Sequence, residues 1–155
     1  MKGMGFYLLV VLTLTVALSS CAQVGRPGSD QRSDRLALAA KAFPAQKNFL
    51  YVDVPAADNG VSNLMVRAFA GDSATTQHLT SIISRGAIAP TYVVVGSQSN
   101  GVAYSTVKAV LDGFKGKKLP YLHLALIGDS AQAGQLQPVA DALHSEYLVL
   151  VLPHE

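Results

Sequence analysis

Residues 92–152 read YVVVGSQSNGVAYSTVKAVLDGFKGKKLPYLHLALIGDSAQAGQLQPVADALHSEYLVLVL, and they contain three apolar runs separated by amphipathic segments. The runs 92–95, 121–127 and 146–152 are apolar at nearly every position, which is typical of strands buried on both faces of a parallel sheet. The first segment between them has apolar residues at helical spacing, namely Val107, Val110, Leu111 and Phe114. This alternation predicts right-handed crossovers in a three-layer α/β domain.

Toward the N-terminus, residues 48–91 add two expected strands and a helix. The strands are Phe49 to Val54 and Leu64 to Ala70, and the intervening Asp58-Asn59-Gly60 predicts an antiparallel hairpin. Ser73 is suited to cap a helix that runs to about Ser84. The sequence therefore predicts a single α/β domain over residues 48–155, with a mostly parallel sheet of about five strands.

Residues 1–20 contribute much of the positive mean hydropathy of +0.30. Lys2 precedes an almost unbroken apolar run from Phe6 to Leu18, and small residues follow. This is the layout of a cleavable secretory signal. We therefore expect residues 1–20 to be a signal peptide.

Leu18-Ser19-Ser20-Cys21 resembles the lipobox of bacterial lipoproteins. The resemblance implies cleavage before Cys21 and acylation of that residue, with palmitate among the attached chains, so that the protein is held in a lipid bilayer. Ala22 stands where an aspartate would be a retention signal, and in a Gram-negative host this implies the periplasmic face of the outer membrane. The predicted location is the cell envelope.

Residues 21–47 are expected to form the lipidated cysteine and a linker. Ala22 to about Asp34 is polar and rich in glycine, proline and serine, which is typical of a flexible tether. Leu36 to Lys41 could add a short helix that ends before Pro44. The folded domain is expected to begin after this linker.

The loop at residues 96–101 is the first candidate for a site, because it joins an expected strand to an expected helix. Ligands bind at this position in open α/β sheets, and N–H groups at a helix N-terminus favour phosphate. The loop resembles the phosphate loop of flavodoxin-like domains, which implies a small anionic or polar ligand on Gly96, Ser97, Ser99, Asn100 and Gly101. Asn100 occupies the position of a glycine in that pattern, and a structural turn is the alternative interpretation.

The segment Gly128-Asp129-Ser130 is the second candidate, together with Asp141 and His144. These fragments resemble serine hydrolases that carry a Gly-Asp-Ser nucleophile motif and an Asp-x-x-His pair. The resemblance implies Ser130 as nucleophile, His144 as base and Asp141 as the residue that orients it. Helix capping by Asp129 or Ser130 is the alternative explanation.

Composition excludes several other classes of function. The chain has 155 residues, one cysteine and a formal net charge of +2, so a disulfide framework within the domain and a nucleic-acid-binding surface are not predicted. The histidines show no metal-ligand spacing, and no cofactor is expected. Lys115-Gly116-Lys117-Lys118 is the one basic cluster, and it suits a solvated turn after a helix or a contact with acidic lipid or polysaccharide.

Two hypotheses follow. In the leading one, the protein is a non-catalytic assembly or interaction component of an envelope complex, with an envelope protein or a second copy of itself as partner. In the alternative, it is a small periplasmic hydrolase or ligand-binding domain that uses the loops 96–101 and 128–130. The distance between the Ser130 and His144 side chains distinguishes the two, since a nucleophile and its base must lie within hydrogen-bond reach.

Overall fold

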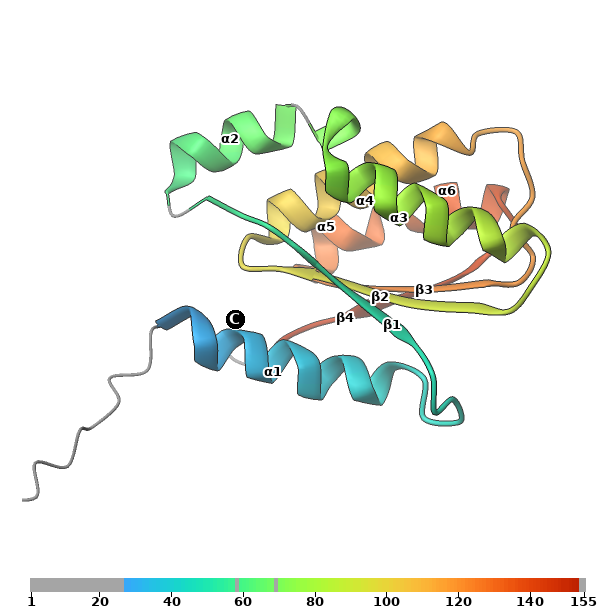
Figure 1. Ribbon diagram of the computed structural model, residues 1–155, viewed down its shortest axis with the longest axis horizontal. Helices are drawn as coiled ribbons and strands as arrows, with labels where there is room; N and C mark the ends of the chain where they lie inside the picture. Colours follow the sequence, from blue (N-terminus) through green and yellow to red (C-terminus); the bar gives the residue numbers. More distant parts are fainter. Residues whose placement is uncertain (1–26, 58, 69, 154–155) are drawn as a thin grey trace, which may run out of the picture.

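The computed structural model describes residues 27–57, 59–68 and 70–153, which form a sheet between two helical layers (Figure 1). The sheet has four parallel strands in the order β1-β2-β3-β4. They are β1 (Leu50–Val54), β2 (Thr91–Ser97), β3 (Leu122–Ile127) and β4 (Glu146–Leu150). The α/β class and the parallel sheet are confirmed.

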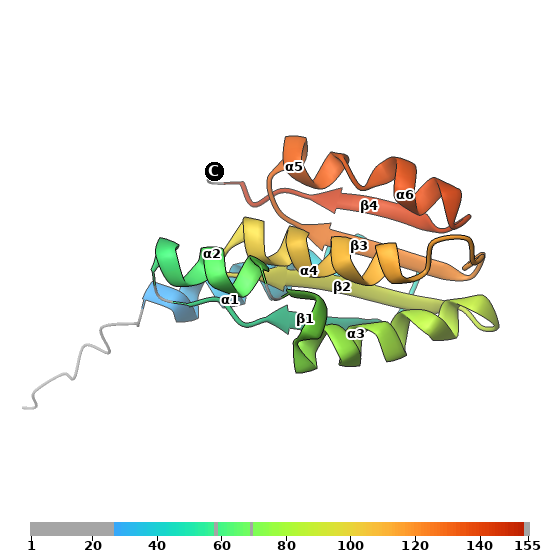
Figure 2. The ribbon, with the colours of Figure 1, turned by 90° about the horizontal axis from the view of Figure 1, so that it is seen from above.

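The helices lie on the sheet as its topology requires. Neighbouring parallel strands that follow one another in sequence place every right-handed crossover on the same face. That face carries α2 (Gly60–Ala68), α3 (Ala74–Ser84), α4 (Asn100–Gly113), α5 (Ser130–Gly134) and α6 (Gln137–Ala142), together with the 3₁₀ turns η1 (Ala70–Asp72) and η2 (Arg85–Ala87) (Figure 2). The opposite face is covered by α1 (Pro27–Ala42), the helix that precedes the first strand.

Alternate residues of the strands divide the apolar core into two clusters. Val93 and Val95 of β2 belong to the larger cluster on the side of α3 and α4, whereas Val94 belongs to the smaller cluster under α1. All three side chains are fully buried. Burial on both faces explains why this strand is apolar without alternation.

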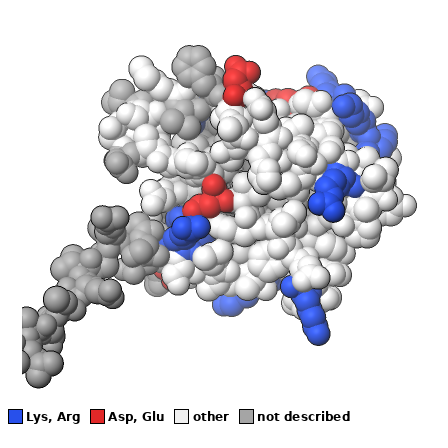
Figure 3. Space-filling model, viewed as in Figure 1, with Lys and Arg blue, Asp and Glu red and all other residues white. Residues whose placement is uncertain are grey.

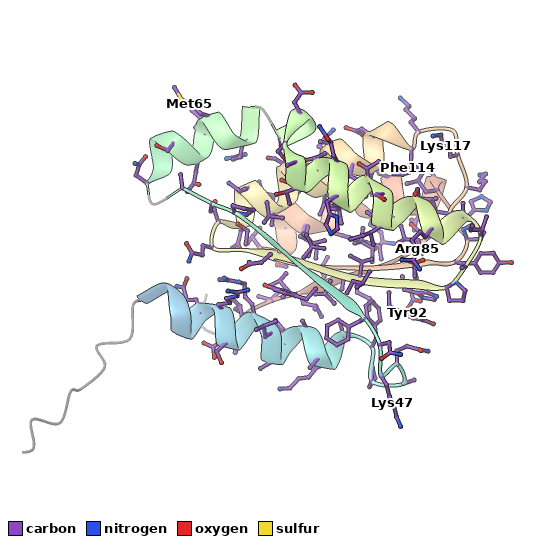
Figure 4. All side chains as sticks on the ribbon, in the orientation of Figure 1. Lys47, Met65, Arg85, Tyr92, Phe114 and Lys117 are labelled. Carbon is purple, nitrogen blue, oxygen red and sulfur yellow. The ribbon has the colours of Figure 1, made fainter. Side chains whose placement is uncertain are left out.

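Aromatic contacts hold the C-terminal end of α1 against the amino ends of the strands. The ring of Phe43 meets that of Tyr92 edge-on, with 5.3 Å between centroids. Tyr92 in turn stacks on His123 at 4.3 Å, and Figure 4 shows Tyr92 on the α1 side of the sheet. Since Phe43 follows the last helical residue, α1 runs antiparallel to the strands.

The prediction of about five strands is wrong, because residues 60–68 form the helix α2. The Asn59 Oδ1 accepts a hydrogen bond from the Ser62 N–H at 2.8 Å, and the Asn59 carbonyl accepts one from the Asn63 N–H at 3.0 Å. Asn-Gly therefore starts a helix here, since the asparagine that favours a turn is equally suited to capping. Met65 points away from the body of the protein (Figure 4) and is 65% exposed.

The prediction of a flexible tether from Ala22 to about Asp34 is wrong from Pro27 onward, whereas the short helix predicted over Leu36 to Lys41 is part of α1. Residues 27–42 are helical, and Ala39 and Ala42 are buried against the sheet. The helix is required because the smaller core cluster would otherwise be exposed to water. The expected signal peptide at 1–20 and Cys21 lie outside the described residues. None of the described helices is both long and apolar enough to cross a membrane.

Candidate functional site

A cavity of about 130 Å³ lies where the carboxyl ends of the strands meet the first half of α1. Helix α1 contributes Gln31, Asp34 and Arg35, the loop after β2 contributes Ser97, Gln98 and Asn100, and the segment after β4 contributes Leu152 and Pro153. The structure thus places two residues of the predicted loop, Ser97 and Asn100, in the wall of a cavity. This is the sheet edge at which open α/β folds bind ligands.

Arg35 is the most deeply buried charged group in this wall. Its side chain is 2% exposed, and its Nη2 lies 3.7 Å from Asp53 Oδ1. The Arg32 Nε lies 3.5 Å from the other oxygen of the same carboxylate. Within the described part of the chain, the Arg35 Nε has no hydrogen-bond partner. Two guanidinium groups therefore share one carboxylate, and one buried donor remains unsatisfied.

Gly96 makes room for this cluster. A Cβ at position 96 would lie 2.7 Å from the Tyr51 Oη and 3.4 Å from the Arg35 Cδ. Tyr51 Oη is also 3.4 Å from Asp53 Oδ1. Burial raises the pKa of the Tyr51 hydroxyl, against a smaller opposing effect of its hydrogen bond with Arg35. The close approach of Arg35 and Tyr51 over β2 accounts for the absence of a side chain at this position.

The remaining loop residues stabilise the turn into α4. The Ser97 Oγ accepts a hydrogen bond from the Ser99 N–H at 3.2 Å. Ser99 is the N-cap residue of α4, but its hydroxyl makes no capping bond in the described part of the chain. A Cβ at Gly101 would lie 3.1 Å from the Arg67 Cζ, so Gly101 allows α2 to approach α4. The structural-turn interpretation therefore explains Ser99 and Gly101.

No family model, curated protein or solved structure matches this chain.

The three residues of the hydrolase hypothesis do not form a triad. Ser130 starts α5 at the carboxyl edge of the sheet, whereas His144 lies just before β4 at the amino edge. The His144 Nε2 is 2.7 Å from the Lys118 Nζ, and the Asp141 Oδ1 accepts a hydrogen bond from the Gln137 Nε2 at 2.8 Å. The length of a strand separates the nucleophile from its base, so the base cannot take the serine proton.

Helix capping explains the Gly-Asp-Ser segment. Asp129 is the N-cap residue of α5, and its Oδ1 accepts a hydrogen bond from the Gln132 N–H at 2.8 Å. Ser130 is the first residue of that helix and is exposed. The segment resembles a nucleophile motif because a strand-to-helix turn uses the same small and polar residues for both purposes.

The basic cluster at 115–118 forms a turn at the amino edge. Gly116 has a φ of 82°, a conformation that glycine adopts without strain. The Lys117 Nζ lies 5.2 Å from the centroid of the Phe114 ring (Figure 4). Lys and Arg side chains gather toward this end of the molecule in Figure 3, and most of the face in view is uncharged. The cluster lies at the sheet edge opposite the cavity.

Sequence reasoning missed Arg35 as a member of a site. Arg35 shares one helix face with Ala39 and Ala42, at intervals of four and three residues. A charged residue within a face of small apolar residues is a detectable signal, but it is informative only once residues 27–42 are recognised as a helix. Asp53 could be identified because it interrupts an apolar strand.

Proposed function

We propose that this protein is a lipid-anchored component of a bacterial cell envelope that binds a partner or ligand and does not catalyse a reaction. The observation that carries the binding role is the placement of Ser130 and His144 at opposite edges of the sheet. The anchoring role is supported by Leu18-Ser19-Ser20-Cys21 directly behind the apolar run from Phe6. The partner is an envelope protein or a second copy of this chain.

The position of α1 relates the anchor to the cavity. Six residue steps separate Cys21 from Pro27, and a chain of that length spans at most about 20 Å. The first turns of α1 lie at the carboxyl edge, where Gln31 lines the cavity. A lipid on Cys21 therefore keeps this edge close to the bilayer, on the periplasmic face of the outer membrane in a two-membraned host.

Fractionation of cells that express the full chain tests the anchor. Cys21→Ser is expected to move the protein from the membrane to the soluble fraction and to abolish processing that globomycin inhibits. Ser20→Ala is the matched control, since it keeps a small residue before the cysteine and should leave the protein in the membrane. Unchanged membrane partitioning of Cys21→Ser would contradict the proposal.

Active-site labelling tests the absence of catalysis. A fluorophosphonate probe reacts with serine nucleophiles that a base activates, so we expect it to leave the wild-type protein unlabelled. Labelling of the wild type that is lost in Ser130→Ala would show an activated nucleophile and overturn the binding role. Affinity purification of the tagged protein from crosslinked envelopes then identifies the partner.

A further inference from the structure

We propose that the cavity at the carboxyl edge binds a small free amino acid, with the ligand carboxylate on Arg35 and its ammonium group at Asp34. This inference rests on the proposed binding role and adds the class of ligand. It depends on the arrangement of charges within the cavity.

The buried end of the cavity suits a carboxylate. The Arg35 side chain is 2% exposed, and 3.7 Å separates its Nη2 from the nearer Asp53 oxygen, which is beyond a normal hydrogen bond. The Nε has no partner in the described part of the chain. A planar guanidinium presents neighbouring donors that match the two oxygens of a carboxylate. An incoming carboxylate on the guanidinium would give this buried cation a hydrogen-bonding anion, which the Asp53 carboxylate at 3.7 Å does not.

The local charge also favours an anion at this end. Arg32 and Arg35 both lie beside Asp53, so the pair of cations has one carboxylate between them. Arg32 has a side chain that is 62% exposed, and water screens its charge. Arg35 is shielded from water, and its charge therefore acts more strongly on a ligand in the cavity.

The solvent end of the cavity suits a cation. Asp34 also lines the cavity but is exposed, so the negative side chain lies nearer to solvent than the buried guanidinium. A ligand that carries both charges can match this gradient, with its carboxylate inward and its ammonium outward. The cavity wall also contains the hydroxyl of Ser97 and the amides of Gln31 and Gln98, which are uncharged polar groups.

The size of the cavity limits the ligand to small amino acids. About 130 Å³ is well below the roughly 300–1,000 Å³ of pockets that enclose drug-sized molecules. Leu152 and Pro153 form an apolar part of the wall, which suits a methyl group. Alanine combines the two charges with such a side chain, and it is the probe that the geometry favours.

Binding to the full chain in detergent micelles tests the inference through ligand-dependent shifts in thermal unfolding. L-alanine should raise the unfolding temperature as its concentration increases, whereas propionate should bind more weakly and ethylamine should have no effect. Arg35→Met, which keeps much of the side-chain volume, should weaken alanine binding about tenfold or more. Asp34→Asn should weaken alanine binding but leave propionate binding unchanged.

Arg32→Gln is the matched control, because Arg32 contacts the same Asp53 without lining the cavity, and it should weaken alanine binding much less than Arg35→Met does. The inference is overturned if alanine has no effect at tens of millimolar, if propionate binds as tightly as alanine, or if Arg35→Met binds alanine normally. If Arg35→Met does not fold, the test rests on Asp34→Asn, which changes an exposed residue, and alanine binding as tight as in the wild type would then overturn the inference. These results do not depend on the cellular fractionation of Cys21→Ser, so failure of the anchor and failure of the site are distinguishable.

Discussion

Gly96 shows how a residue suggestive of ligand binding can instead be required for packing. The sequence predicts it as part of an anion-binding loop, but it lies on β2 beneath Arg35 and Tyr51. A side chain at this position would displace the hydroxyl of Tyr51, which lies beside Asp53. The glycine influences the cavity indirectly, through the position of Arg35.

A pair of substitutions tests this role of Gly96. Gly96→Ala places a methyl group 2.7 Å from the Tyr51 Oη, and overpacking of this kind costs about 1–3 kcal/mol of unfolding free energy. Tyr51→Phe removes that oxygen and leaves the nearest contacts at 3.4 Å. We expect the double variant to recover most of the loss in urea unfolding. A Gly96→Ala protein as stable as the wild type, or a double variant with no recovery, would refute the packing role.

The elements show that similar sequence signals can have different physical consequences. Ser73 and Ser99 both precede helices, and the sequence predicts a turn into a helix at each of them. Ser73 caps α3, since its Oγ accepts a hydrogen bond from the Thr76 N–H at 3.1 Å. Ser99 precedes α4 without such a bond within the described residues. Only the first serine satisfies a donor that the helix leaves free.

The two serines provide a matched comparison. Ser73→Ala should lower the free energy of unfolding by about 1 kcal/mol, the usual value of an N-cap hydrogen bond. Ser99→Ala should change it by less than about 0.5 kcal/mol, because the hydrogen bond from the Ser99 backbone N–H to the side-chain Oγ of Ser97 is retained. Chemical denaturation of both variants measures the difference. Equal losses would show that capping does not distinguish these helices.

Across the whole molecule, α1 is the third layer of the domain. Ala39 lies on the face of α1 that packs against the sheet and is fully buried, whereas the neighbouring Ala40 is exposed. Removal of this layer would expose Val94, Ala125 and Ile127, which α1 covers on the sheet. The layer also contributes Arg35, so the cavity depends on it.

Aspartate at adjacent positions of α1 tests whether this layer stabilises the whole domain. Ala39→Asp buries an unpaired carboxylate and should cost more than about 3 kcal/mol, whereas Ala40→Asp lies in solvent and should stay within about 0.5 kcal/mol of the wild type. Urea unfolding followed by far-UV circular dichroism compares them. If both variants unfold at the same denaturant concentration, α1 is not an integral layer of the domain.

Local sequence patterns were sufficient for β1, β2, β3, β4, α3 and α4, because apolar runs and helical spacing indicate burial on one face or two. They failed for α2, where Asn59 suits a turn and a helix cap equally, and for α1, whose polar first half masks the buried face of Arg35, Ala39 and Ala42. The chain order of the strands determines which sheet face the crossovers leave open. Only the tertiary structure places α1 on that face. It also brings Arg35 beside Asp53, puts Arg35 and Ser97 in the wall of one cavity, and separates Ser130 from His144. The local sequence does not determine these relations, because they depend on contacts between residues distant in sequence.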